Sequence, residues 1–94
     1  MIKSTRNKGF QMTFENGWTI SVQFGYGNYC GNGKHPEGYY FSEHTEIVSS
    51  PDAEIAAWPE GGDMYDFGGD TVKGYCSADE VADWISKVKS FEKI

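Results

Sequence analysis

Two short runs in which apolar and polar residues alternate constrain the fold of this chain more than any other feature of its sequence. Large apolar residues occupy every second position on both sides of Asn16-Gly17: Phe10, Met12 and Phe14 before it, and Trp18, Ile20, Val22 and Phe24 after it. Alternation with a period of two is typical of half-buried β-strands, and Asn-Gly is typical of a tight turn. This segment therefore predicts an antiparallel hairpin.

The length of the turn decides whether the apolar residues of both strands share one face. A two-residue loop would pair Phe14 with Thr19 and would put the two apolar sets on opposite faces of the sheet. A three-residue loop over 15–17, with Gly17 in the left-handed conformation of a bulge, brings both sets to the same face. The sequence therefore predicts three opposed pairs: Phe14 with Trp18, Met12 with Ile20, and Phe10 with Val22.

The remaining strand signals are weaker and flank glycine-rich stretches. Residues 39–49 and 53–58 lie on either side of Ser50-Pro51-Asp52, a turn signal, and predict a second hairpin. Residues 71–75 predict a fifth strand, whereas residues 1–8 are polar and are expected to be frayed.

The C-terminal segment carries the signals of an amphipathic helix. Ser77 and Glu80 have the spacing of a capping box, and Lys87 and Lys89 lie near the other end, where the helix dipole favours cations. Its apolar residues have helical spacing: Val81, Trp84, Ile85, Val88 and Phe91. The sequence thus predicts an α+β fold, with an antiparallel sheet of four to five strands built from two hairpins and one C-terminal helix packed on one face.

The length of 94 residues favours a single domain over 1–94. No run approaches the roughly 18 to 20 apolar residues that a membrane span needs, and two cysteines are too few for a disulfide framework, so we expect a cytoplasmic protein with reduced thiols. Fourteen acidic and eight basic side chains give a net charge of −6, which disfavours nucleic acid as a partner.

Two sets of side chains have the donor chemistry of a metal site: Cys30, His35, His44 and Cys76 for zinc, and Asp63, Asp66 and Asp70 for a hard cation. The first set lacks the paired spacing of structural zinc sites, and the second lacks the residue order of a calcium loop. We therefore expect no metal and no cofactor, and we interpret the aspartates as solvated loop carboxylates.

Candidate nucleophiles are equally unspecific. Cys30 and His35 are near in sequence, and Cys76 precedes the helix cap, where the helix dipole favours a thiolate. Cys76 also occupies the position before the N-cap from which a side chain packs on Val81, and this structural role is the favoured interpretation. We expect the chain not to be an enzyme.

Residues 25–38 have the composition of a binding loop or of a structural excursion across the sheet edge. Glycine-rich backbone is combined with rigid aromatic and adaptable polar side chains, as in known binding loops. The candidate binding residues are Tyr26, Asn28, Tyr29, Asn32, Lys34, His35 and Tyr39. No phosphate-binding fingerprint is present, because the G-x-G at 25–27 opens no helix.

The strings FENGWTISVQFGYGNYC at 14–30, DAEIAAW at 52–58 and VKGYCSADEVADWI at 72–85 resemble a group of short uncharacterised bacteriophage proteins. This resemblance implies a phage-encoded, stoichiometric inhibitor of a host defence protein, working in the host cytoplasm. Two alternatives remain open: an oligomeric sponge that sequesters a nucleotide signal, and an unrecognised small hydrolase. A sponge needs positive charge, for which Lys34, His35 and Lys73 are the mid-chain candidates, and homo-oligomerisation would pool it.

Overall fold

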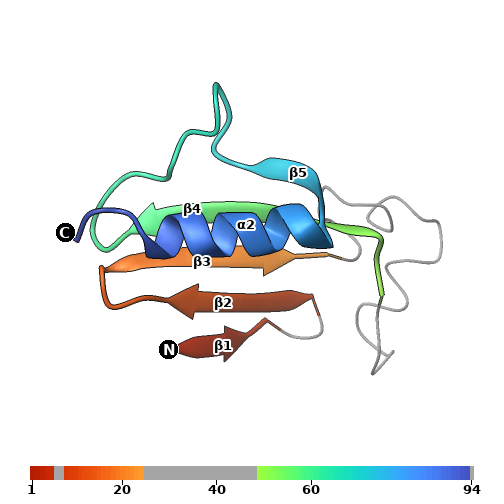
Figure 1. Cartoon of the computed structure of the whole chain (residues 1–94), viewed down its shortest axis with the longest axis horizontal. Coiled ribbons are helices and arrows are strands. Elements are labelled where there is room, and N and C mark those ends of the chain that lie inside the picture. The colour runs from red at the N-terminus through yellow and green to blue at the C-terminus, as the bar shows by residue number, and fades with distance from the viewer. Residues whose placement is uncertain (6–7, 25–48, 94) are drawn as a thin grey trace.

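The regular elements follow the alternation and capping signals of the sequence. The computed structural model describes residues 1–5, 8–24 and 49–93, which form a five-stranded sheet with one helix packed on it (Figure 1). The elements are β1 (Ile2–Ser4), β2 (Gly9–Thr13), β3 (Trp18–Gln23), β4 (Asp52–Pro59), β5 (Lys73–Ser77) and α2 (Ala78–Lys89). The strands lie in chain order and every neighbouring pair is antiparallel. The predicted α+β class is confirmed.

The first hairpin has the predicted three-residue loop. The Phe14 amide donates to the Trp18 carbonyl at 2.9 Å, and the Gly17 amide donates to the Phe14 carbonyl at 3.0 Å. Gly17 has φ 89°, a conformation that glycine adopts without a Cβ clash. The ladder beyond the turn contains the predicted pairs: Met12 with Ile20, and Phe10 with Val22. The predicted register is therefore confirmed.

The expectation that residues 1–8 are frayed is wrong for the first four residues. Ile2–Ser4 form β1, which pairs with β2 at the edge of the sheet. Next to this strand, the Thr13 amide donates to the Met1 carbonyl at 2.8 Å, and the Met1 nitrogen donates to the Thr13 carbonyl at 3.0 Å. Backbone pairing of this kind requires no apolar side chains, so the polar composition gave no sign of the strand.

β4 lies between β3 and β5 in the sheet. The hairpin partner predicted for residues 53–58 was 39–49, of which 39–48 lie outside the described residues. The predicted fifth strand is confirmed, but it begins at Lys73 and extends to Ser77. Between the pairs Ala53–Cys76 and Ile55–Lys73, β5 has one residue more than β4, and within this bulge Tyr75 has φ 56°.

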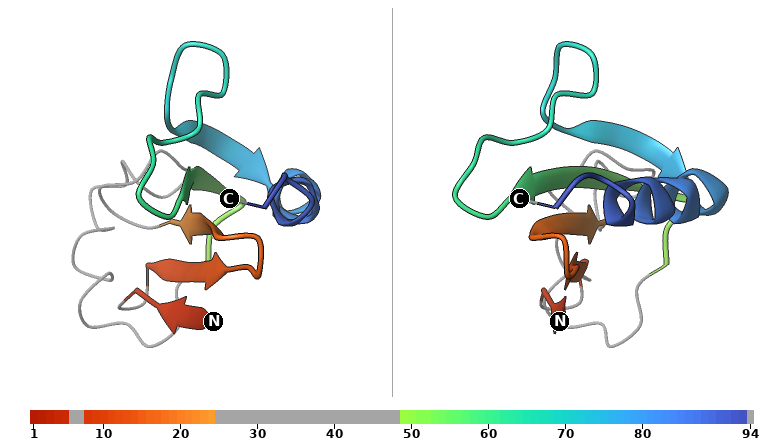
Figure 2. Two further views of the ribbon diagram at one scale, coloured as in Figure 1. Left: turned by 90° about the vertical axis from the view of Figure 1, so that its left-hand side faces the viewer. Right: turned by 60° about the vertical axis from the view of Figure 1, so that its left-hand side comes forward.

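Helix α2 begins with the predicted capping box. The Glu80 amide donates to the Ser77 side chain at 3.2 Å, and the Ser77 amide donates to the Glu80 carboxylate at 3.2 Å. The helix lies on one face of the sheet (Figure 2) and contacts β3, β4 and β5. Among the described residues, no helix lies above the same face of β1 and β2, as Figure 1 shows.

The core lies between α2 and the strands beneath it. Its fully or nearly fully buried residues are small or aliphatic: Ile20, Val22, Ala53, Ile55, Ala57, Cys76 and Val88. These residues form two clusters, and Trp84 of the helix packs against both. The predicted apolar stripe of the helix is therefore the face that meets the sheet.

Two aromatic residues of the glycine-rich stretch 61–70 complete this core. The Tyr65 amide donates to the Ala57 carbonyl of β4 at 2.8 Å. Its ring lies 5.8 Å from Trp84, 5.3 Å from Phe91 and 5.0 Å from Phe67 between centroids. Phe67 also lies 4.9 Å from Trp84, edge to face. The stretch that the sequence presents as a flexible loop therefore supplies two rings to the core.

Candidate functional site

The predicted binding residues, Tyr26, Asn28, Tyr29, Asn32, Lys34, His35 and Tyr39, all lie outside the described residues. The same holds for Cys30 and His44, so the binding loop and the Cys30–His35 pair stay predictions. The described residues that flank this segment are Phe24, which follows β3, and Ser49, which precedes β4.

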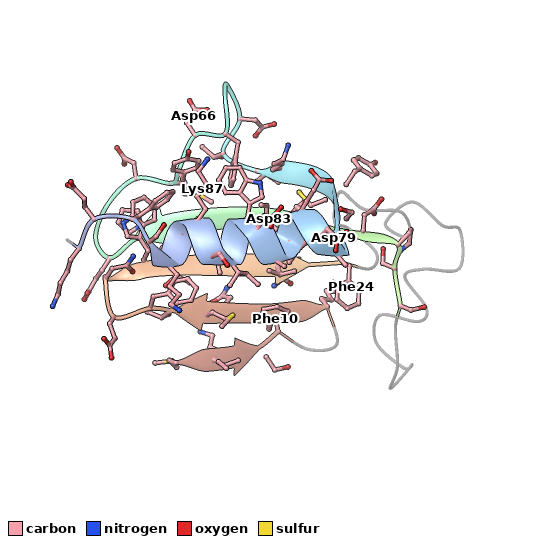
Figure 3. All side chains as sticks on the ribbon, viewed as in Figure 1. Phe10, Phe24, Asp66, Asp79, Asp83 and Lys87 are labelled. Atoms are coloured by element: carbon pink, nitrogen blue, oxygen red, sulfur yellow. The ribbon has the colours of Figure 1, made fainter. Side chains whose placement is uncertain are left out.

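A pocket of about 350 Å³, here called the end pocket, lies between these flanking residues and the N-terminal end of α2. Its apolar lining comes from Val22, Phe24, Ala53, Cys76 and Val81, and its remaining lining from Ser49, Ser50, Pro51, Asp52 and Ala78. Figure 3 shows Phe24 beside this end of the helix and Asp79 on its first turn. The lining of the end pocket is thus partly apolar, and Asp79 lies near it at the N-terminal end of α2.

The one cysteine among the described residues is a buried core residue. Cys76 is 0% exposed, and its thiol donates to the carbonyls of Lys73 at 3.7 Å and Gly74 at 3.9 Å. Burial raises the pKa of the Cys76 thiol, and the nearby Glu80 carboxylate adds to this effect. The favoured structural interpretation is confirmed, because Val81 packs against the buried cluster that contains Cys76, and the raised pKa of the thiol disfavours a thiolate.

The acidic loop carboxylates hold turns of their own segment. The Asp66 carboxylate accepts from the Gly68 amide at 2.8 Å and also from the Gly69 amide, and these bonds lower its pKa. The Asp70 carboxylate accepts from the Val72 amide at 3.1 Å. In the described ranges, no three His, Cys, Asp or Glu side chains form a group that could hold a metal ion.

A second and larger hollow, here called the edge groove, lies where the first hairpin meets the end of α2. It measures about 550 Å³, which is within the usual range of ligand pockets. Its apolar lining is Met1, Ile2, Met12, Phe14 and Phe91, and its polar lining is Thr13, Glu15, Asn16, Lys89 and Lys93. Met1 and Ile2 are 83% and 73% exposed, so their apolar surface faces solvent.

The edge groove exists because α2 ends above β3. Asn16, in the hairpin turn, fixes this end of the helix: its Nδ2 donates to the carbonyls of Val88 at 3.0 Å, Lys89 at 3.1 Å and Phe91 at 3.1 Å. The lysines that follow the last buried turn, Lys89 and Lys93, are both exposed. One side of the groove is therefore basic, although the chain as a whole is acidic.

Comparison with protein-family models, with curated proteins and with solved structures found no match for this chain. Within the part of the chain that the structure describes, no helix is both long and apolar enough to span a membrane.

Sequence reasoning missed the edge groove, although part of its signal was visible. The alternation that placed Met12 and Phe14 on the apolar face also requires something to cover them, and one short helix cannot cover five strands. Figure 3 shows Phe10 on β2, outside the part of the sheet that α2 overlies. The basic side of the groove had no such signal, because the position of Lys89 beside the hairpin depends on where the helix crosses the sheet.

Proposed function

We propose that this chain is a non-catalytic protein that acts by forming a stoichiometric complex with a protein partner. The observation that supports this proposal best is the apolar face of β1 and β2, on which no helix of the described residues packs. Helix α2 contacts β3, β4 and β5, whereas Met1 and Ile2 are largely exposed beside a groove of about 550 Å³. Exposed apolar surface that continues into a groove with a polar rim is typical of protein interaction sites.

The chemistry of the described side chains also favours binding. Cys76 is buried with a raised pKa, and Asp66 and Asp70 are engaged by the backbone of their own turns. The resemblance to short bacteriophage proteins suggests the class of partner: a host defence protein that the chain blocks in the host cytoplasm. The sponge alternative rests chiefly on Lys34 and His35, which lie outside the described residues, and it stays a prediction.

The proposal can be tested by native mass spectrometry of the affinity-tagged chain, purified from a bacterial host that carries phage-defence systems. We expect the intact chain in a complex of fixed ratio with one host protein, with no small molecule retained. A retained nucleotide on an oligomer of the chain would instead identify a sponge. Multiple turnovers of a substrate would identify an enzyme.

The same purification also tests the loop prediction. Tyr26→Ala and Tyr29→Ala should keep the melting temperature within a few degrees of the wild-type value and should abolish the complex, because truncating an aromatic anchor typically costs about 2 kcal/mol or more of binding free energy. If both variants retain the complex, the loop prediction is wrong and the face of β1 and β2 remains the proposed interface.

A further inference from the structure

We propose that the free edge of β1, together with the edge groove, binds an extended segment of the partner protein in which acidic residues alternate with apolar ones. This inference rests on the proposed function, since it names the surface and the partner chemistry of the same stoichiometric complex. The segment would extend the sheet as an added strand, a common mode of peptide recognition.

The hydrogen-bonding pattern of β1 leaves its outer edge open. Met1 exchanges both backbone bonds with Thr13, and the Thr5 amide donates to the Gly9 carbonyl at 3.0 Å. In an antiparallel ladder the bonded positions alternate, so the backbone groups of Ile2 and Ser4 point away from β2. Among the residues that the structure describes, no strand pairs with this side of β1. An incoming strand therefore finds two amides and two carbonyls to bond.

The two faces of β1 favour different side chains in an added strand. Ile2 pairs with Met12 and so lies on the face of the edge groove, whereas Lys3 pairs with Gln11 and lies on the opposite face. Residues of an added strand alternate in the same way. Those beside Ile2 enter apolar surroundings, and those beside Lys3 meet a cation.

The edge groove also has charged residues, which lie on the face of Ile2 and not on that of Lys3. Lys89 and Lys93 line the edge groove opposite β1, and Glu15 is the one carboxylate among its described lining residues. An acidic residue near the end of the bound segment would lie within the field of these lysines. Complementary charge of this kind raises association rates and selects against cationic partners.

A second copy of this chain fits the edge less well. Pairing two β1 strands through the outward groups of Ile2 and Ser4 would place Lys3 directly opposite the Lys3 of the other copy. Like charges at directly opposed positions destabilise an antiparallel pair. The edge therefore favours a foreign acidic strand over self-association.

The test uses the whole chain, labelled with ¹⁵N, and two synthetic peptides of about nine residues, one alternating glutamate with valine and the other alternating lysine with valine. We expect the glutamate peptide to bind and to shift and protect the amides of Ile2 and Ser4, with much weaker binding of the lysine peptide. Ser4→Pro removes an outward amide without removing a β1–β2 bond, so it should fold normally and weaken binding at least about tenfold. Ser4→Ala, which keeps the amide, is the matched control and should bind as the wild type does.

Charge reversal provides a second variant that does not depend on proline. Lys3→Glu should weaken the glutamate peptide about tenfold and strengthen the lysine peptide. Lys73→Glu, the same change on β5 at the other edge of the sheet, should alter neither affinity. Equal binding of both peptides, or full binding by Ser4→Pro, would overturn the proposal. Self-association of the wild-type chain that Ser4→Pro abolishes would overturn it too, by showing that a second copy occupies the edge.

The natural complex separates this inference from the proposed function. If no stoichiometric protein complex forms, the proposed function fails. If a complex forms and Ser4→Pro and Lys3→Glu leave its affinity unchanged, only the assignment of the interface fails.

Discussion

Asn16 carries out two structural tasks with the two ends of one amide. Its Oδ1 accepts from the Trp18 amide at 3.0 Å within the hairpin turn, while its Nδ2 donates to three carbonyls at the end of α2. The last carbonyls of a helix have no partner inside the helix, and here a residue far away in sequence satisfies them. The side chain thus ties the first hairpin to the last element of the chain.

The two tasks of Asn16 can be separated by Asn16→Asp, because aspartate keeps the acceptor toward Trp18 and loses the donor toward the helix. We expect the free energy of unfolding to fall by about 2 kcal/mol, since three carbonyls lose a donor and a negative charge faces the negative end of the helix dipole. Urea denaturation measures this loss. Gln11→Glu, the same amide-to-acid change on the sheet face away from α2, should stay within about 0.5 kcal/mol of the wild type. A loss no larger than that of Gln11→Glu would show that the Nδ2 bonds contribute nothing to stability.

The buried thiol of Cys76 makes stability depend on pH. Burial raises its folded-state pKa above the ordinary value of 9.0, so the unfolded chain loses the proton first as pH rises. The contribution of the protonated Cys76 thiol to the free energy of unfolding is therefore fully present below about pH 9 and is lost as the pH rises through the folded-state pKa. Cys76→Ala lacks this dependence.

Both proteins should be compared in a Cys30→Ser background by urea denaturation between about pH 8 and about pH 10.5. We expect the difference in unfolding free energy between the Cys76 protein and Cys76→Ala to change above pH 9, with the cysteine protein losing more. A difference that stays constant over this range would mean that the thiol is not desolvated in the folded chain.

At the scale of elements, the sequence predicts those features that depend on contacts between residues close together in the chain. The register of the first hairpin followed from Gly17 and from the need to place Phe14 and Trp18 on one face. The cap of α2 followed from Ser77 and Glu80. Both are decided within a few residues, so the sequence alone predicts them.

Elements that depend on distant partners were less predictable. β1 forms because the edge of β2 offers backbone groups, and β5 lies two residues later than its predicted range and has a bulge at Tyr75 where it pairs with β4. The edge groove belongs to the same class, since it joins the first hairpin to residues beyond the helix. Local periodicity contains no information on which distant segments meet, so a site made from several of them was out of reach.

At the scale of the whole molecule, α2 contacts only β3, β4 and β5, and within the described residues the two sides of the sheet beside the helix differ. Beside the part of β4 that β5 does not pair with, the segment with Tyr65 and Phe67 packs against the helix and the sheet, so aromatic rings cover that side of the core. Beyond β3, Figure 1 shows no described segment above β1 and β2. The rings of Tyr65 and Phe67 stabilise the core, whereas the face of β1 and β2 is the surface that we propose for binding.

This division predicts that Tyr65, although it lies in a glycine-rich stretch, behaves as a core residue. Tyr65→Ala removes a ring that contacts Trp18, Trp84, Phe91 and Phe67, and we expect a loss of about 3 kcal/mol in unfolding free energy. For a domain of this size each kcal/mol lowers the melting temperature by about 4–8 °C, so the variant should melt at least about 12 °C early.

Tyr75→Ala is the matched control, because Tyr75 is 50% exposed and has the same side chain. It should stay within about 1 kcal/mol of the wild type in urea denaturation, with an unchanged slope against denaturant. If Tyr65→Ala melts with the wild type, the rings of 61–70 do not seal the core.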